Sequence, residues 1–238
     1  MQPDTLVVLL GDSPRMPTGL GRIAGDLAAH LHAASDRLGI HFLQVGWEYG
    51  QPALQPLPWQ LVTFPEIGQD WGARQVNPLI AATAEQLGYN QQQIVMLSVW
   101  DPARCFEYRE SPWAKWGYFA VDGHNRNGRF GGPAADTVQH YDRVLGYTEY
   151  GAKVLSKTLN PLTDPAVQWL PHGHYWAAAQ RLQAEQDAQP PTQGYRIGCV
   201  ATNQPRKDLG LFFATIAHLR QSGERVYGWL HTDQLVTE

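Results

Sequence analysis

Short apolar runs alternate with amphipathic stretches along most of the chain. Residues 6–10 form a continuous apolar run, which is typical of a strand covered on both faces of a sheet. Residues 22–34 carry Ile23, Leu27 and Leu31 at intervals of four, which predicts a helix with one apolar face. By the same criteria we expect strands over residues 40–47, 60–64, 94–100, 116–121, 144–147 and 167–170, and helices over residues 76–87 (capped by Gly88) and 150–159. This alternation predicts an α/β fold, a Rossmann-like, doubly wound, mostly parallel sheet with helices on both faces.

The composition changes between residues 177 and 194, where Gln, Ala and Pro dominate. We interpret this stretch as a helix followed by an interdomain linker. A strand over residues 196–201, a polar turn and a helix from about Leu209 then follow, and one more strand precedes the end at Glu238. We therefore expect a first domain over residues 1–178, a linker over 179–194, and a truncated second Rossmann-like domain over 195–238.

A strand–helix–strand fragment of this size buries too little core to be stable alone. It would leave apolar surface and open strand edges. The apolar side chains concerned are Leu211, Phe212, Ile216, Val226, Trp229 and Leu230. We expect the fragment to pack on the first domain, to pair with another chain or a second copy of itself, or to be poorly ordered.

Charge and cysteine content exclude several classes of protein. The 238 residues carry a formal net charge of −4, so there is no basic field to attract nucleic acid. Cys105 and Cys199 are the only cysteines, which argues against a disulfide framework and fits a reducing cytoplasm. The N-terminal apolar run follows Asp4 and is too short for a signal peptide or a transmembrane segment. We expect a soluble cytoplasmic protein.

Polar side chains follow several predicted strands, where open parallel sheets bind ligands. Asp101 follows the strand over residues 94–100, although Asp101 with Pro102 also suits the start of a helix. Asp122 and His124 follow the strand over residues 116–121. A carboxylate and an imidazole there can bind sugar hydroxyls or share a proton, and the alternative is a solvated Asp-Gly turn.

Two turns have the features of anion sites. Gly19 and Gly21 enter the first helix, where small residues and unpaired N–H groups let an anion approach, although a plain flexible loop would look the same. Arg206 and Lys207 lie in the turn before the helix of the second domain. Two cations beside a helix N-terminus favour phosphate binding over an ordinary exposed pair.

Two further patterns suggest other chemistry. The sequence Gly-Asp-Ser ending at Ser13 also occurs in a class of serine esterases, but no Asp here is followed three residues later by the His that such enzymes need. His172 and His174 stand two residues apart, but no Cys or third His lies at ligand spacing. We therefore expect no metal site and favour a hinge or domain-interface role for this segment.

Five motifs together resemble those of retaining, nucleotide-sugar-dependent glycosyltransferases of the GT-B fold, of the group 1 or family 4 type. They are TGLGR at residues 18–22, YFAVDG at 118–123, YTEYGAKVL at 147–155, LPHG at 170–173 and TNQPRKDLGL at 202–211. They occur in the family's order and span nearly the whole chain. The resemblance implies two Rossmann-like domains that face each other across a cleft.

The resemblance also implies an activity and its residues. Such enzymes transfer a sugar from a nucleoside diphosphate donor to an acceptor, here unknown, with retention. Gly19 and Gly21 match the loop that approaches the donor diphosphate, and Arg206 and Lys207 match the cations that hold it. These cations stabilise the leaving group, so neither a metal nor another cofactor is expected.

The same comparison assigns residues in the first-domain crevice, where sugar and acceptor meet. Asp122 and His124 match catalytic positions there, and Glu149 can reach the same cleft, as can Asp101. His172 and Gly173 match the turn before the interdomain crossover.

The chain departs from the family in three places. Ala120 replaces the usual Pro, His174 and Tyr175 replace a common Val-Asp, and no two glutamates stand at the spacing of the pair that binds the donor sugar and ribose. These departures leave open a catalytically inactive remnant or a module that only binds an acceptor.

Overall fold

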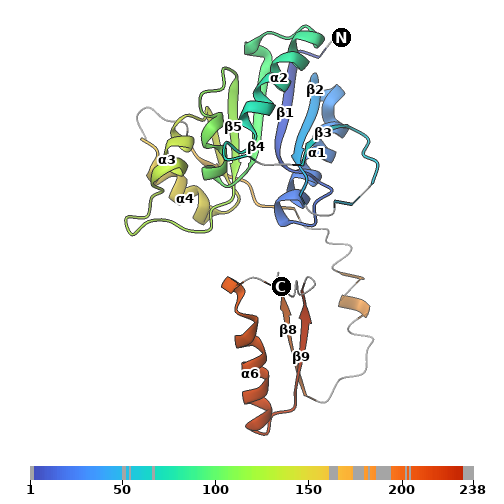
Figure 1. Ribbon diagram of the computed structural model, residues 1–238, viewed down its shortest axis with the longest axis vertical. Coiled ribbons are helices and arrows are strands. Elements are labelled where there is room, and N and C mark those ends of the chain that lie inside the picture. Colours follow the sequence, from blue (N-terminus) through green and yellow to red (C-terminus); the bar gives the residue numbers. More distant parts are fainter. Residues whose placement is uncertain are drawn as a thin grey trace. The chain divides into compact units, whose positions relative to one another are not determined.

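The protein forms two compact units, Met1–Gly173 and His174–Glu238, in a computed structural model (Figure 1). The structure describes residues 3–49, 52–53, 55–65, 68–160, 166–173, 180–181, 183–185, 194–201, 203 and 205–232, and for Arg206 the backbone only. Each unit is described by itself. The expected linker over residues 179–194 lies largely outside the described residues, so its boundaries stay a prediction.

The first unit is built on a seven-stranded sheet with the strand order β3-β2-β1-β4-β5-β6-β7, in which all neighbours are parallel. The strands are β1 (Thr5–Asp12), β2 (Ile40–Trp47), β3 (Gln60–Phe64), β4 (Ile94–Trp100), β5 (Ala114–Phe119), β6 (Arg143–Gly146) and β7 (Gln168–Trp169). The chain runs outward from β1 to β3 and then returns to β4 on the other side of β1. The predicted doubly wound parallel sheet is therefore confirmed, with its strand order reversing between β1 and β4.

Helices cover both faces of this sheet. The helical elements are α1 (Gly19–Leu38), α2 (Ala73–Leu87), α3 (Gly132–Gln139) and α4 (Glu149–Thr158), with 3₁₀ turns η1 (Gln91–Gln93) and η2 (Pro102–Tyr108). Leu6, Val8 and Leu10 pack in one core cluster with residues of α2. Leu9 packs in a second cluster with residues of α1. Successive side chains of β1 thus point to opposite faces, which is why this strand reads as a continuous apolar run.

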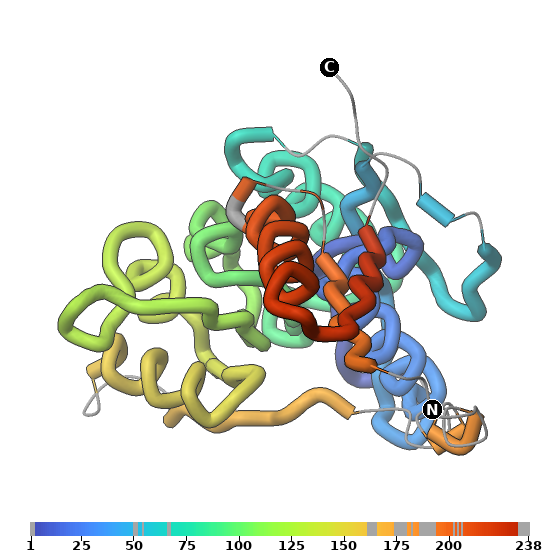
Figure 2. The backbone as a smooth tube through the Cα atoms, turned by 90° about the horizontal axis from the view of Figure 1, so that it is seen from below, coloured from blue at the N-terminus to red at the C-terminus, as the bar shows by residue number. Residues whose placement is uncertain are grey.

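The ends of the helices follow from their capping residues. α1 begins three residues before the predicted start, because the Thr18 hydroxyl accepts a hydrogen bond from the Gly21 amide and caps the helix. Gly88 ends α2 in a left-handed conformation, as predicted. α3 was not predicted, since Gly132 and Pro133 open it and only Thr137 and Val138 of this short helix are buried. α3 and α4 lie side by side (Figure 1, Figure 2).

The second unit contains β8 (Tyr195–Val200), a 3₁₀ turn η3 (Pro205–Lys207), α6 (Leu209–Gln221) and β9 (Val226–His231), with β8 and β9 parallel. The predicted strand, turn, helix and strand are confirmed. Phe212 and Ile216 of α6 lie over Gly228, so the helix covers one face of the two strands. Trp229 projects from the other face and is 58% exposed.

The exposure of the second unit agrees with the sequence in part. Leu211 and Trp229 are exposed as expected, Phe212, Ile216 and Leu230 are half-buried, and Phe213 is a further exposed apolar side chain. The expectation was wrong for Val226, which is 2% exposed at the start of β9. Packing of this unit on the first domain or on another chain stays a prediction. None of the helices in the ranges given above is long and apolar enough to cross a membrane.

Gly72 and Gly88 both need a backbone conformation that favours glycine, but only Gly72 also needs the absence of a side chain. Gly72 and Gly88 both have positive φ, of 79° and 78°. A Cβ on Gly72 would lie 2.4 Å from the ring of buried Trp47, whereas one on Gly88 would meet nothing within 4 Å. We expect Gly88→Ala to lower the free energy of unfolding by about 1 kcal/mol, which is the backbone cost alone. Gly72→Ala should lower it by about 3 kcal/mol or more.

Urea denaturation of the two variants and the parent protein measures this difference. Equal losses for the two variants would show that Trp47 does not pack against the turn before α2.

Candidate functional site

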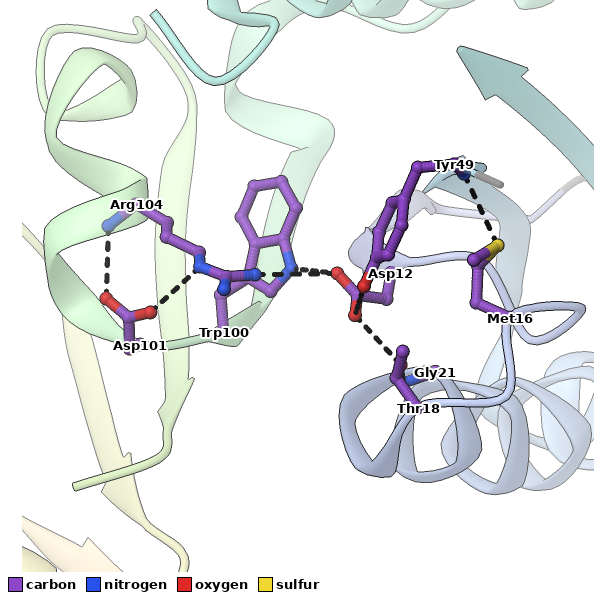
Figure 3. Close-up of polar contacts among 8 residues, drawn as sticks. All are labelled: Asp12, Met16, Thr18, Gly21, Tyr49, Trp100, Asp101 and Arg104. Carbon is purple, nitrogen blue, oxygen red and sulfur yellow. Dashed lines mark hydrogen bonds and ion pairs between the residues drawn. The ribbon is translucent and has the colours of Figure 1, made fainter. Parts of the chain in front are cut away.

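The densest group of polar contacts in the first unit lies where the strand order reverses. Asp12 is the last residue of β1 and Trp100 the last residue of β4, and they are 1% and 0% exposed. Figure 3 shows the Asp12 carboxylate between Trp100 and Arg104 on one side and Tyr49 and Thr18 on the other. We call these five residues the Asp12 cluster.

The buried carboxylate of Asp12 accepts hydrogen bonds from three side chains. The Trp100 indole donates to Oδ1 at 2.8 Å. The Thr18 hydroxyl donates to Oδ2 at 2.9 Å, and the Tyr49 hydroxyl donates to the same oxygen at 3.1 Å. Arg104 supplies a nearby positive charge, with Nη1 3.7 Å from Oδ1. The carboxylate is therefore satisfied although it is buried, and it ties together β1, β4, the segment after β2 and the start of α1.

Tyr49 stays protonated in this setting. Partial burial, and then the nearby Asp12 carboxylate, raise the pKa of the Tyr49 hydroxyl. The residue as a whole nevertheless remains 42% exposed. Tyr49 thus acts as a hydrogen-bond donor to Asp12 at neutral pH while part of the residue stays accessible to solvent.

Asp101 has the capping role that the sequence offered as an alternative. Its carboxylate accepts hydrogen bonds from the Ala103 and Arg104 amides at the start of η2. The same carboxylate lies 2.9 Å from Nε of Arg104. The Arg104 guanidinium in turn lies over the Trp71 ring, 4.8 Å from its centroid. Asp101 therefore positions Arg104 beside the Asp12 cluster, and a role for Asp101 in binding a ligand stays a prediction.

Ser13 does not have the environment of an esterase nucleophile. It is 0% exposed, and its hydroxyl donates to Oε1 of Glu48 at 2.9 Å. Arg15 contacts the same carboxylate oxygen at 3.6 Å. A nucleophilic serine needs a general base and access to substrate, so this geometry argues against the esterase alternative.

Gly19 and Gly21 have different structural roles. Gly21 is buried, and a Cβ there would lie 2.6 Å from the carbonyl oxygen of Ser13 and 2.9 Å from that of Met16. Gly19 is exposed, and a Cβ there would meet nothing within 4 Å. The glycine at 21 is required by the chain's own packing, and Gly19 is the position open to a ligand.

The predicted catalytic residues Asp122 and His124 follow β5 in an exposed loop. The His124 ring lies 5.9 Å from that of Tyr150 in the first turn of α4, and its Nδ1 contacts the Asn125 carbonyl at 2.6 Å. Glu149, the first residue of α4, pairs with Lys153 at 2.7 Å, and this contact lowers the pKa of Glu149. The structure therefore brings His124 close to the start of α4, beside Glu149.

His172 contacts two tyrosines near the end of the first unit. The Tyr118 hydroxyl donates to the Leu170 carbonyl at 2.6 Å, and Nδ1 of His172 lies 3.0 Å from the same hydroxyl. The Tyr147 ring lies 4.3 Å from the His172 ring. Partial burial lowers the pKa of His172 and raises that of Tyr118 to about 12, so both are neutral at pH 7. These contacts attach the segment before Gly173 to β5 and β6.

The turn with Arg206 and Lys207 lies in the second unit, as η3 before α6. Lys207 is exposed, and the side chain of Arg206 lies outside the described residues. Asp208 caps α6 with φ of 43° and accepts a hydrogen bond from the Leu211 amide at 3.2 Å. The predicted turn is present, and a joint role with Gly19 in holding a diphosphate stays a prediction.

The sequence indicated Asp12 only within a serine motif, and it did not indicate Tyr49, Trp71 or Trp100. The one available signal was a carboxylate and an indole at the final positions of two apolar strands. Among the residues that the structure describes, no three His, Cys, Asp or Glu side chains gather to hold a metal ion.

Comparisons with known proteins show the fold. No family model and no curated protein matches the chain. A solved structure titled trehalose-6-phosphate from E. coli bound with UDP-2-fluoro glucose is 16% identical, with a TM-score of 0.52, over 98% of this chain and 66% of that one. A structure of OtsA in the apo state is 19% identical, with a TM-score of 0.54, over 98% of this chain and 66% of that one.

A third structure gives the same result. An α,α-trehalose-phosphate synthase (UDP-forming) from Burkholderia vietnamiensis is 14% identical, with a TM-score of 0.56, over 96% of this chain and 64% of that one. The chain thus spans about two thirds of the length of these structures. Likeness at this level of identity shows a shared fold, the Rossmann-like α/β architecture of GT-B glycosyltransferases.

Replacing Asp12 should destabilise the first unit. In Asp12→Asn an amide must face three hydrogen-bond donors and Arg104 loses a buried counter-ion, so we expect the free energy of unfolding to fall by about 2 kcal/mol or more. The matched control is Asp122→Asn, at an exposed position, which should change it by less than about 0.5 kcal/mol. Chemical denaturation followed by tryptophan fluorescence measures both. An Asp12→Asn protein as stable as the control would show that the carboxylate is not needed.

Gly19 and Gly21, both in the first turn of α1, should also differ in their tolerance of a methyl group. Gly21→Ala forces two backbone carbonyls to move and should cost about 2 kcal/mol or more. Gly19→Ala adds a methyl group in open space and should stay within about 0.5 kcal/mol of the parent. Thermal unfolding by circular dichroism compares them, and a larger loss for Gly19→Ala would contradict the close packing at Gly21.

Proposed function

We propose that this chain is a glycosyltransferase, or a part of one, that takes a sugar from a nucleoside diphosphate donor and gives it to an acceptor hydroxyl with retention and without a metal. The observation that carries the proposal is the fold. Nearly the whole chain follows solved structures of trehalose-phosphate synthases, one of which is described as bound to UDP-2-fluoro glucose. The family motifs recognised in the sequence support the same assignment independently.

The start of α1 supports donor binding in the first unit. Helix N-termini carry N–H groups without intrahelical partners and a partial positive charge, which suits an anion such as a diphosphate. The Gly21 amide already donates a hydrogen bond to the Thr18 hydroxyl. The amides of Gly19 and Leu20 come first in the helix, and Gly19 adds no side chain that would obstruct a ligand.

The second unit would supply the cations. Arg206 and Lys207 precede α6 on a turn between a strand and a helix. As the bond from the anomeric carbon to the diphosphate breaks, these cations would stabilise the negative charge on the leaving group. The acceptor oxygen bonds to the same carbon, and its proton leaves with the diphosphate. Asp122 and His124 would orient the sugar and the acceptor at the first-domain crevice.

A module that binds ligands without turnover is the alternative. It stays open because Ala120, His174 and Tyr175 depart from the motifs of the family that the sequence resembles. Binding and turnover must therefore be measured separately.

Donor binding is the first test. We expect UDP or another nucleoside diphosphate to bind in isothermal titration calorimetry, and Arg206→Ala and Lys207→Ala each to weaken binding by about tenfold, since each removes one charge-assisted contact. Arg220→Ala is the matched control, because Arg220 is an exposed cation in the last turn of α6, at the end of the helix away from η3. The affinity of this variant for the nucleoside diphosphate should equal that of the parent.

Turnover is the second measurement on the same proteins. Release of the nucleoside diphosphate from a nucleotide sugar, faster with a panel of acceptors than without, supports the transferase. Binding without such release supports the non-catalytic module. No binding of any nucleoside diphosphate or nucleotide sugar at millimolar concentration would exclude the transferase and leave only a module that binds an acceptor.

A further inference from the structure

A cleft of about 450 Å³ opens beside the Asp12 cluster in the first unit. It is lined by Tyr49, Gly68, Gln69, Trp71 and Arg104. Tyr49 and Arg104 belong to the Asp12 cluster, so the cleft lies at the edge of the sheet where the strand order reverses. Open α/β sheets bind ligands at this position. None of the residue roles derived above uses this cleft.

The aromatic walls of the cleft are held in place before any ligand arrives. The Tyr49 hydroxyl is held by its hydrogen bond to Asp12, while the residue as a whole remains 42% exposed. The Trp71 ring packs edge-on against Trp100, with centroids 5.9 Å apart, and it lies under the Arg104 guanidinium. Rings that are already ordered lose little conformational freedom when a ligand packs against them.

Trp71 also has a strained backbone. Its φ is 50°, in the left-handed region that bulky residues rarely adopt, and Gly72 follows with φ of 79°. The Tyr108 hydroxyl, buried beneath it, donates to the Trp71 carbonyl at 2.8 Å and helps to hold this conformation. Such strain costs about 1–3 kcal/mol and is concentrated at functional sites. A glycine would fit this backbone without strain, so the indole ring offsets the cost through its packing against the core and through the surface that it presents to the cleft.

The charges around the cleft disfavour an anionic ligand. Among the described residues that line it, Arg104 is the one cation, and it lies 2.9 Å from an Asp101 oxygen and 3.7 Å from an Asp12 oxygen. Two carboxylates against one guanidinium leave a net charge of −1, so a phosphate or carboxylate would be repelled. The guanidinium N–H groups and the Gln69 amide can still hydrogen-bond uncharged hydroxyl groups.

An adjoining cavity of about 890 Å³ shares Gly68 and Gln69 with this cleft. Its charged lining residues are Asp70, Arg74 and Glu107, which again sum to a net negative charge. A ligand longer than one ring could therefore extend past Gln69 without meeting an excess of positive charge.

We propose that this cleft binds the acceptor as an uncharged sugar or glycoside, with the C–H face of a ring packed on Trp71 and Tyr49 and its hydroxyls on Gln69 and Arg104. Aromatic side chains with a few polar groups are the usual lining of such sites. The inference rests on the proposed function and adds the chemical class of the acceptor. By the same charges, a sugar phosphate is expected to bind more weakly than an uncharged sugar.

The test uses the full chain and two sets of probes in saturation-transfer NMR and calorimetry. The neutral probes are maltose, trehalose and methyl glucosides, and the anionic probe is glucose 6-phosphate. At least one neutral probe should bind more tightly than glucose 6-phosphate. Trp71→Gly and Gln69→Ala should weaken that binding by about tenfold or more. Trp71→Gly suits the left-handed backbone but loses the packing of the ring against Trp100, so circular dichroism checks that it is folded, and Gln69→Ala tests the cleft without that loss.

Trp169→Ala is the matched control, because Trp169 is a 51% exposed indole on β7 of the same unit. It should bind the neutral probe as the parent does. UDP binding, measured on every variant, separates the two hypotheses, since Trp71→Gly and Gln69→Ala should leave it unchanged. If UDP fails to bind the parent, the proposed function fails. If UDP binds but no neutral probe does, the cleft is not the acceptor site. The same holds if Trp169→Ala and Trp71→Gly weaken binding of the neutral probe equally.

A third variant tests the charge argument directly. Asp101→Asn keeps a side chain that caps η2 but removes one of the two carboxylates beside Arg104. We expect glucose 6-phosphate to bind this variant about tenfold more tightly than it binds the parent. An unchanged or weaker affinity would overturn the claim that Arg104 is neutralised by its two partners.

Discussion

The buried carboxylate of Asp12 is the interaction on which the proposed ligand-binding edge of the first unit depends. It lies at the end of β1, where the strand order of the sheet reverses. It accepts hydrogen bonds from residues at three separate places in the chain. A buried charge with these partners is stable, whereas the loss of any one of them would leave an unsatisfied group. The start of α1, the segment after β2 and the end of β4 are therefore held in one arrangement.

This arrangement divides the edge into two chemically different regions. On the α1 side, Thr18 links Asp12 to the Gly21 amide, and the exposed Gly19 begins the helix beside it. On the β4 side, Arg104 is drawn toward Asp12 and Asp101 and away from any anionic ligand. Under the proposed function, the first region would hold the donor diphosphate and the second the uncharged hydroxyl groups of the acceptor.

The architecture could be predicted from the sequence, but the contacts of the site could not. Strands β2, β3 and β4 match the expected residues because buried parallel strands are apolar runs with clear ends. α3 was missed because it is short and few of its side chains are buried. The partners of Asp12 lie 6, 37 and 88 residues away in the chain, and only the strand order brings them together. A Gly-x-Gly pattern likewise does not show which glycine is packed and which is open.

The central claim is that the edge of the sheet between β1 and β4 is the ligand-binding edge of the first unit. Amide chemical shifts of the ¹⁵N-labelled protein, followed during a titration with UDP, test it most directly. The account predicts that the amides of Gly19 and Leu20, at the start of α1, shift with a saturable dependence on UDP concentration. Saturable shifts confined to other regions of the first unit, or no shifts at millimolar UDP, would contradict it.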